Sequence, residues 1–220
     1  MIARDLITNL IPPLKTSDSV DKAKRWMHEF NVSHLPIVNN EQFLGLLSEV
    51  DILDLNQPEE PIGNHELKLS QTKVLANVHL YDVIEISSEL SVSLVPVVDE
   101  HNNYKGVITA QNLVKFLGKS FSVGEPGGII ELVISRSEYS LSEVSRLVET
   151  NDAHVISSFV SSSSNSNEMK VTLKVNTSEL DAIIATFRRF EYNVNASYQE
   201  TEHTDALKDR YDALMSYLKI

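Results

Sequence analysis

The first half of the chain repeats one pattern of apolar and polar positions. Residues 32–38 form an apolar segment with a central proline, and this segment returns 60 residues later as residues 92–98. A polar loop and a second apolar segment follow in each copy, at residues 45–51 and residues 106–112. Apolar positions with helical spacing lie before and after each copy. The pattern therefore predicts two repeats of the type helix–strand–strand–helix.

Helical spacing defines the apolar faces of the flanking helices. Asp18 or Ser19 could cap the first of them, because both residue types accept hydrogen bonds from free backbone N–H groups. The positions assigned to these faces are Val20, Ala23, Met27 and Phe30 before the first copy, Val83, Ile86 and Leu90 before the second, Val50, Ile52, Leu53 and Leu55 after the first, and Leu113, Val114 and Leu117 after the second.

Regular patterns resume after residues 124–128, a glycine-rich turn that marks a domain boundary. Four strands and two helices follow in the order β-α-β-β-α-β, which is the ferredoxin-like plan. From Thr204 onward, apolar residues at helical spacing predict an amphipathic C-terminal helix. The predicted strands are residues 129–135, 155–161, 169–175 and 192–198, and the predicted helices are residues 141–148 and 180–190.

Composition narrows the classes of function. The chain has 19 Lys and Arg against 31 Asp and Glu, a net charge of −12 that both halves share equally, so neither half attracts nucleic acid or anionic lipid. The absence of cysteine excludes disulfides and thiolate chemistry. No apolar run is long enough for a signal peptide or a membrane span. We therefore expect a cytoplasmic protein with neither a nucleic-acid nor a membrane partner.

The proline-containing strand, the polar turn and the sequence Gly-apolar-apolar-Ser/Thr-x-x-Asp resemble the cystathionine-β-synthase (CBS) domain. Both signatures occur at matching offsets over about residues 1–120, so the two copies resemble the tandem CBS pair, or Bateman module. The resemblance implies a ligand-sensing function, with AMP, ADP or ATP as the effector bound between the repeats.

Two residues at the start of the helix after the first copy carry the candidate ligand chemistry. The Ser48 hydroxyl and nearby free N–H groups could meet a phosphate, and Asp51 could accept hydrogen bonds from a vicinal diol. The family resemblance implies these phosphate and ribose contacts. The alternative is that Ser48 caps the helix and Asp51 suits the helix dipole. The second copy holds Thr109 and Asn112 at these positions, and a neutral amide is a poorer partner for two hydroxyls.

The resemblance also implies that strand residues enclose the adenine ring. These residues are Leu35 and Pro36 in the first copy and Val95 and Pro96 in the second, although they could equally be core residues. His34 could approach a phosphate, or it could be a surface histidine. The first copy is therefore expected to provide the better equipped site.

The second domain resembles the ACT domain, a small-molecule regulatory fold that commonly pairs its sheet with another copy. The combination resembles the CBS–ACT proteins called acetoin-utilisation proteins. Amino-acid-binding ACT domains usually have an Asp-x-Pro-Gly-like turn after the first strand, whereas residues 136–140 contain neither Pro nor Gly. We therefore expect no useful affinity for free amino acids.

These patterns predict an α+β protein, a CBS-domain pair of two β-α-β-β-α-type repeats followed by a ferredoxin-like, ACT-like domain and a helix. The predicted segments are residues 1–55 for CBS repeat 1, 56–73 for a linker and lead-in strand, 74–120 for CBS repeat 2, 127–200 for the ACT-like domain and 203–220 for the helix.

The expected function is a non-catalytic regulatory module that requires no cofactor, takes a small-molecule effector and forms a homodimer. An enzyme would need a catalytic constellation, and the sequence has no glycine-rich phosphate cradle and no Gly-x-Ser-x-Gly elbow. The seven histidines are scattered, without ligand spacing for a metal. The alternative is a protein-interaction or dimerisation module whose ligand sites have decayed.

Overall fold

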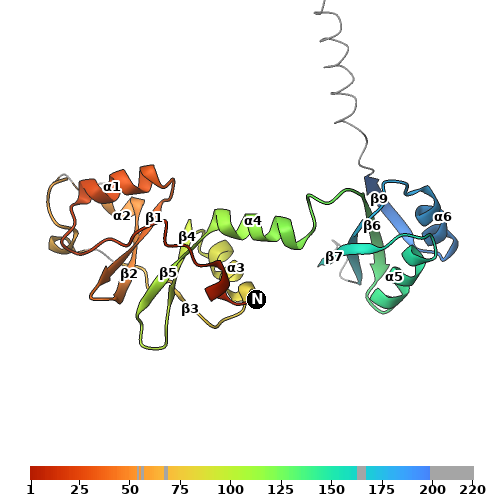
Figure 1. Cartoon of the computed structure of the whole chain (residues 1–220), viewed down its shortest axis with the longest axis horizontal. Coiled ribbons are helices and arrows are strands. Elements are labelled where there is room, and N and C mark those ends of the chain that lie inside the picture. The colour runs from red at the N-terminus through yellow and green to blue at the C-terminus, as the bar shows by residue number, and fades with distance from the viewer. Residues whose placement is uncertain (54, 56, 67–68, 163–166, 199–220) are drawn as a thin grey trace, which may run out of the picture. The chain divides into compact units, whose positions relative to one another are not determined.

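The computed structural model describes residues 1–53, 55, 57–66, 69–162 and 167–198. The chain divides into two compact units, Met1–Phe116 and Leu117–Ile220, and each has a hydrophobic core of its own. The elements of both units are labelled in Figure 1. The predicted C-terminal helix, residues 203–220, lies outside the described residues.

The first unit contains the two predicted repeats. Each has a helix, an antiparallel strand pair and a second helix, and both strand pairs shift register at equivalent places, between Ile37 and Val38 and between Val97 and Val98. The short helices η1 (Ala3–Leu6) and η2 (Ile62–Asn64) precede the two repeats. The elements are α1 (Val20–Glu29), β1 (His34–Asn39), β2 (Gln42–Ser48) and α2 (Glu49–Leu53), then α3 (Leu80–Glu89), β4 (Leu94–Val98), β5 (Tyr104–Thr109) and α4 (Ala110–Ser120).

A lead-in segment pairs in parallel with the proline-containing strand of each repeat. Leu14 forms an isolated bridge to Ile37, and β3 (Val74–Leu75) pairs with Val97 and Val98 of β4. We expected the second lead-in strand within residues 56–73, and the structure forms it directly after them. It forms at Val74 because the side chain of this valine is buried in the core of the unit.

Ser19 caps the first helix. The backbone N–H of Lys22 donates to Ser19 Oγ at 3.2 Å, which satisfies one of the free donors in the first turn of α1. Asp18 instead accepts from the ammonium group of Lys22 at 2.7 Å. Of the two candidate caps, the structure therefore selects the serine.

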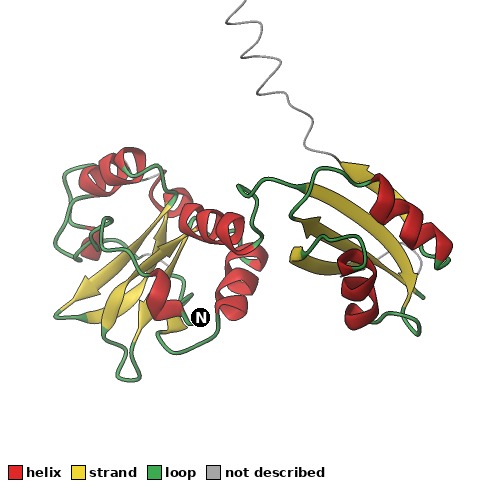
Figure 2. Cartoon of the chain, turned by 45° about the vertical axis from the view of Figure 1, so that its right-hand side comes forward, coloured by secondary structure: helices red, strands yellow, loops and turns green. Residues whose placement is uncertain are grey.

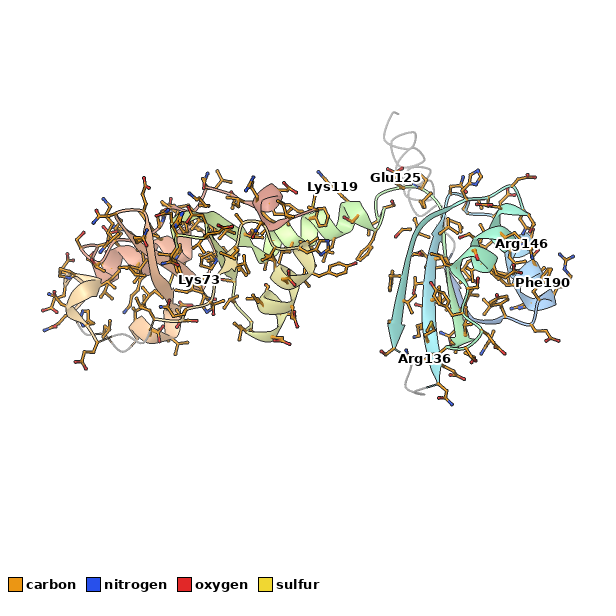
Figure 3. All side chains as sticks on the ribbon, turned by 90° about the horizontal axis from the view of Figure 1, so that it is seen from below. Lys73, Lys119, Glu125, Arg136, Arg146 and Phe190 are labelled. Carbon is orange, nitrogen blue, oxygen red and sulfur yellow. The ribbon has the colours of Figure 1, made fainter. Side chains whose placement is uncertain are left out.

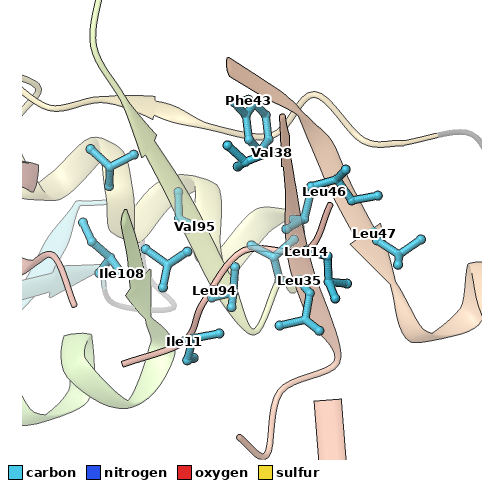
Figure 4. Close-up of a cluster of buried hydrophobic side chains, with 14 of the residues drawn as sticks. Ile11, Leu14, Leu35, Val38, Phe43, Leu46, Leu47, Leu94, Val95 and Ile108 are labelled. Carbon is cyan, nitrogen blue, oxygen red and sulfur yellow. The ribbon is translucent and has the colours of Figure 1, made fainter. Parts of the chain in front are cut away.

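The core of the first unit is built from both repeats. Leu35 and Leu47 of the first repeat and Leu94 and Ile108 of the second have no exposed surface, and Leu14 from the lead-in segment is equally buried. Figure 4 shows these side chains gathered in one cluster. Because strands from both repeats share the cluster, the first unit is a single packed body.

Four apolar positions that we assigned to core-facing helix surfaces are exposed instead. Val50 and Leu53 on α2 are 75% and 59% exposed, Val114 on α4 is 69% exposed, and Leu90 is 55% exposed. The assignment was wrong at these positions because adjacent helix residues point in different directions, and α2 directs only its buried Ile52 towards the core.

The second unit has the predicted order of elements. Its four strands form one antiparallel sheet in the order β7-β8-β6-β9, and the two helices pack on one face of it (Figure 2). Along β6, buried and half-buried residues alternate, as expected for a sheet with one covered face. The elements are β6 (Gly128–Ser135), α5 (Leu141–Glu149), β7 (Val155–Ser162), β8 (Glu168–Val175), α6 (Asp181–Arg189) and β9 (Asn193–Tyr198).

No helix within the described ranges is both long enough and apolar enough to cross a membrane.

Candidate functional site

The structure brings Ser48 and Asp51 together at the junction of β2 and α2. The Ser48 hydroxyl donates to Asp51 Oδ2 at 2.7 Å, and the Ser48 backbone N–H donates to the same oxygen at 3.0 Å. The backbone N–H of Asp51 donates in return to Ser48 Oγ at 3.3 Å. This is the helix-capping arrangement of the alternative interpretation. The second carboxylate oxygen, Oδ1, has no hydrogen-bond partner in the described part of the chain.

At the equivalent junction of β5 and α4, the two matching residues share fewer hydrogen bonds than Ser48 and Asp51 do. The backbone N–H of Asn112 donates to Thr109 Oγ1 at 3.1 Å, so the threonine caps α4. The side-chain amide of Asn112 makes no hydrogen bond to any residue that the structure describes. The substitution of Asp by Asn therefore leaves a free amide where the first repeat has a bonded carboxylate.

His34 lies between the two repeats rather than on an open surface. Its Nδ1 accepts from the backbone N–H of Ser93 at 3.3 Å and lies 3.0 Å from the hydroxyl of Ser33. Ser33 in turn donates its backbone N–H to the Ser93 hydroxyl at 3.1 Å. Burial lowers the pKa of His34, and the carboxylate of Asp51 opposes this shift. His34 thus connects the repeat boundary with the first candidate site.

The four strand residues predicted to enclose a base are core residues. Leu35 and Val95 have no exposed surface, and Pro36 and Pro96 are buried beside them. None of the four lines the cavity described next. Their burial matches the alternative interpretation, in which they hold the strands in the core.

A cavity of about 560 Å³ opens at the second strand–helix junction. This volume is in the range of pockets that hold small ligands. The first turn of α4, the segment before α1 and the C-terminal end of α1 form its walls, so both repeats contribute. The lining residues are Thr8, Leu10, Ile11, Glu29, Phe30, Asn31, Val32, Ser93, Thr109, Ala110, Gln111 and Asn112.

Sequence reasoning identified Thr109 and Asn112 of this cavity and missed its other polar residues, among them Glu29, Asn31 and Ser93. The repeat could have drawn attention to Asn31, because Asn31 and Ser91 occupy equivalent positions just before the proline-containing strands. The structure gives both residues a positive φ, 52° and 50°. No signal in the sequence connects the end of α1 with the start of α4. That connection exists only once the two repeats pack together.

The second unit has a smaller cavity of about 330 Å³ at the end of β6. Glu138, Glu191 and Tyr192 line it, and no Lys or Arg is among its lining residues. Beside it, Arg146 binds Glu143 through two hydrogen bonds and stacks over the Phe190 ring at 5.7 Å (Figure 3). The cavity therefore offers no cation to the carboxylate of an amino acid.

Metal-binding groups are not assembled at either cavity. Among the described residues there is no cluster of three or more His, Asp or Glu side chains that could hold a metal ion.

Comparisons with known proteins agree with the repeat. The family model of the CBS domain matches residues 3–57 and 72–119. A homoserine O-acetyltransferase of Methanococcus vannielii is 27% identical over 117 residues, which are 51% of this chain and 24% of the relative. The chain thus matches about a quarter of the length of that curated relative.

Two solved structures are similar to part of this chain. A CBS domain pair/ACT domain protein from Thermotoga maritima has a TM-score of 0.49 and 20% identity, over 54% of this chain and 98% of its own. The protein CBSX2, solved in complex with AMP, has a TM-score of 0.47 and 24% identity, over 54% of this chain and 96% of its own.

Proposed function

Because residues 3–57 and 72–119 of this chain are a tandem pair of CBS domains, we propose that it is a regulatory module that senses an adenosine nucleotide in the cleft of the pair and performs no catalysis. One observation carries the proposal. Each repeat places a hydroxyl residue and an Asp or Asn together at a strand–helix junction, and in the first repeat Asp51 Oδ1 has no hydrogen-bond partner among the described residues.

In the first repeat, the proposed contacts are Ser48 with phosphate and Asp51 with ribose. Asp51 Oδ1 has no hydrogen-bond partner among the described residues, so the carboxylate can accept from a hydroxyl while Oδ2 keeps its bonds to Ser48. In the second repeat, Thr109 and Asn112 occupy the equivalent positions, without a carboxylate. A carboxylate binds a diol more strongly than an amide does, which supports a dominant first site.

The second candidate function is an interaction module whose ligand sites have decayed. The hydrogen-bonded pair of Ser48 and Asp51 favours it, because the Ser48 hydroxyl already donates to Asp51 Oδ2 and accepts from the Asp51 backbone N–H. The loss of the acid at Asn112 points in the same direction. This candidate predicts a folded protein that no adenosine nucleotide stabilises.

We further propose that the chain forms a homodimer through its first unit. Leu53 on α2 and Val114 on α4 occupy equivalent positions in the two repeats, and both are more than half exposed. Val50 is exposed on the same short helix α2. Exposed apolar side chains on both of these helices are typical of surfaces that a partner covers, and a second copy is the commonest partner.

We also propose that the second unit is an ACT-like domain without affinity for free amino acids. The turn after β6 contains Glu138 rather than the small residues that allow close backbone approach, and the carboxylates of Glu138 and Glu191 repel an amino acid's carboxylate.

A thermal-shift panel tests the proposed function. AMP, ADP and ATP are compared with ribose 5-phosphate, which keeps the phosphate and sugar but lacks the base. A ligand present at 100 times its Kd stabilises the folded state by about 2.7 kcal/mol, which raises the melting temperature by several degrees. At least one adenosine nucleotide is expected to give this shift. No shift with any of the three nucleotides overturns the proposal in favour of the interaction module.

A further inference from the structure

The cavity of the second repeat has an unusual charge distribution. Glu29 is the one charged side chain among the residues that line it, and no Lys or Arg is among them. Glu29 is the last residue of α1, it lines the cavity, and it is exposed to solvent. A phosphate that entered here would meet a carboxylate and no cationic side chain.

The two helix ends at the cavity do not change this balance. The first residues of α4 bring the partial positive charge of a helix N-terminus to one wall. The C-terminal end of α1, with its cap Phe30, brings a partial negative charge of similar size to another wall. Since these partial charges oppose each other, the full charge of Glu29 sets the net electrostatics of the cavity.

The polar groups of the cavity suit hydroxyls rather than anions. Asn112 offers an amide that no described residue uses, and Thr109 offers a hydroxyl that accepts one backbone hydrogen bond. An amide and a hydroxyl both donate and accept, so they can bind the hydroxyl groups of a sugar. Neither can neutralise two or more negative charges.

From this cavity we infer that the second repeat selects a neutral or cationic ligand of nucleoside size, and that Glu29 determines this selectivity. The inference rests on the proposed function, because it concerns a cleft of the same CBS pair. It assigns different ligands to the two repeats: nucleotides to the junction of Ser48 and Asp51, and uncharged or positively charged nucleosides to the cavity beside Glu29. A residue of the first repeat thus controls the specificity of the second.

Three probes with the same base and sugar test the charge preference. They are 5′-amino-5′-deoxyadenosine, which is cationic at neutral pH, adenosine, which is neutral, and AMP, which is anionic. Calorimetric titration uses the full chain with Asp51→Ala, so that the first repeat contributes little. The expected order of affinity is cationic, then neutral, then anionic. Each step is about threefold to tenfold, as expected for one charge pair in a solvated cleft.

Substitutions at Glu29 then link the order to the carboxylate. Glu29→Gln is expected to reduce the preference for the cationic over the anionic probe by about tenfold or more across the two steps, and Glu29→Lys is expected to reverse it. Glu149→Gln is the matched control, because Glu149 also ends an amphipathic helix but lies in the second unit. It is expected to leave all three affinities unchanged.

The possible failures separate the inference from the proposed function. If AMP binds most tightly in the Asp51→Ala chain, or if Glu29→Gln leaves the order of affinities unchanged, the inference is wrong and the proposed function stands. If none of the three probes binds to the unsubstituted chain, the inference is wrong, and if AMP, ADP and ATP also give no thermal shift, the proposed function is overturned as well.

Discussion

At the scale of single residues, His34 couples protonation to the packing of the two repeats. Its Nδ1 accepts a hydrogen bond from Ser93 across the repeat boundary, which requires that this nitrogen carries no proton. Protonation of the ring would place a positive charge in a half-buried position and remove this hydrogen bond. The lowered pKa of His34 has this desolvation as its main cause.

The lowered pKa predicts a loss of stability in mild acid. The unfolded chain takes up the proton on His34 near pH 6.5, before the folded chain does, so the free energy of unfolding decreases as the pH falls through 6.5 and levels off below the folded-state pKa. His34→Leu, which introduces the residue found at the equivalent Leu94, should reduce this pH dependence. Urea unfolding between pH 8 and pH 5 measures it.

His28→Gln serves as the control for this experiment, since His28 is an exposed histidine on α1. It should leave the pH dependence of unfolding as it is in the unsubstituted chain. A pH dependence that is the same with and without the His34 side chain would show that this histidine does not couple protonation to folding.

Part of the candidate site could be predicted at this scale. A spacing of three residues at a helix start places Ser48 beside Asp51 and Thr109 beside Asn112 whatever the rest of the fold does. Glu29 could not be found in this way, because it lines the cavity only through the packing of α1 against the other repeat.

At the scale of elements, Gly45 and Gly106 make room for a chain segment that crosses each repeat. The segment is residues 69–71 at Gly45 and residues 7–9 at Gly106. Both have positive φ, 156° and 138°, and a Cβ atom on either would overlap a side chain, that of Leu69 or of Ile7. Beside Gly106, Thr8 exchanges backbone hydrogen bonds with Val107 at 2.8 and 3.2 Å. The glycine of the repeat motif is therefore needed for close approach of two backbones.

Gly106→Ala is expected to destabilise the first unit by about 2–6 kcal/mol, because backbone strain and overpacking each contribute about 1–3 kcal/mol. Gly118→Ala is the matched control. Gly118 lies in α4 with open space around its Cα, and alanine there should stabilise the helix by about 0.5–1 kcal/mol. Urea unfolding of the two variants measures both effects. Similar stabilities would contradict the close approach at Gly106.

Most elements could be predicted from periodicity. The predicted strand of residues 129–135 and β6 (Gly128–Ser135) differ by one residue, and the helix of residues 141–148 ends one residue later, at Glu149. The two-residue strand β3 was predicted too early in the chain, within residues 56–73. So short a segment has no periodicity of its own, because its position is defined by pairing with β4. Long amphipathic elements are encoded locally, whereas lead-in strands are defined by pairing.

At the scale of the whole molecule, the exposed apolar positions on α2 and α4 support a dimer. Leu53→Glu combined with Val114→Glu should place charges in its interface and produce a monomer, because a buried unpaired carboxylate is strongly unfavourable. Lys115→Glu, at an exposed neighbour on α4, should leave the dimer intact. Light scattering at micromolar concentration measures the mass. A monomeric unsubstituted chain would exclude the proposed dimer.

We propose that the CBS pair binds an adenosine nucleotide, with the first repeat dominant. Titration calorimetry with AMP, ADP and ATP on the unsubstituted chain, on Asp51→Ala and on Asn112→Ala tests this proposal. We expect saturable micromolar binding, a tenfold to hundredfold loss with Asp51→Ala from a charge-assisted contact of about 1.5–3 kcal/mol, and about a fivefold loss or less with Asn112→Ala. Equal losses would contradict a dominant first repeat, and the absence of binding to the unsubstituted chain would contradict the sensing function itself.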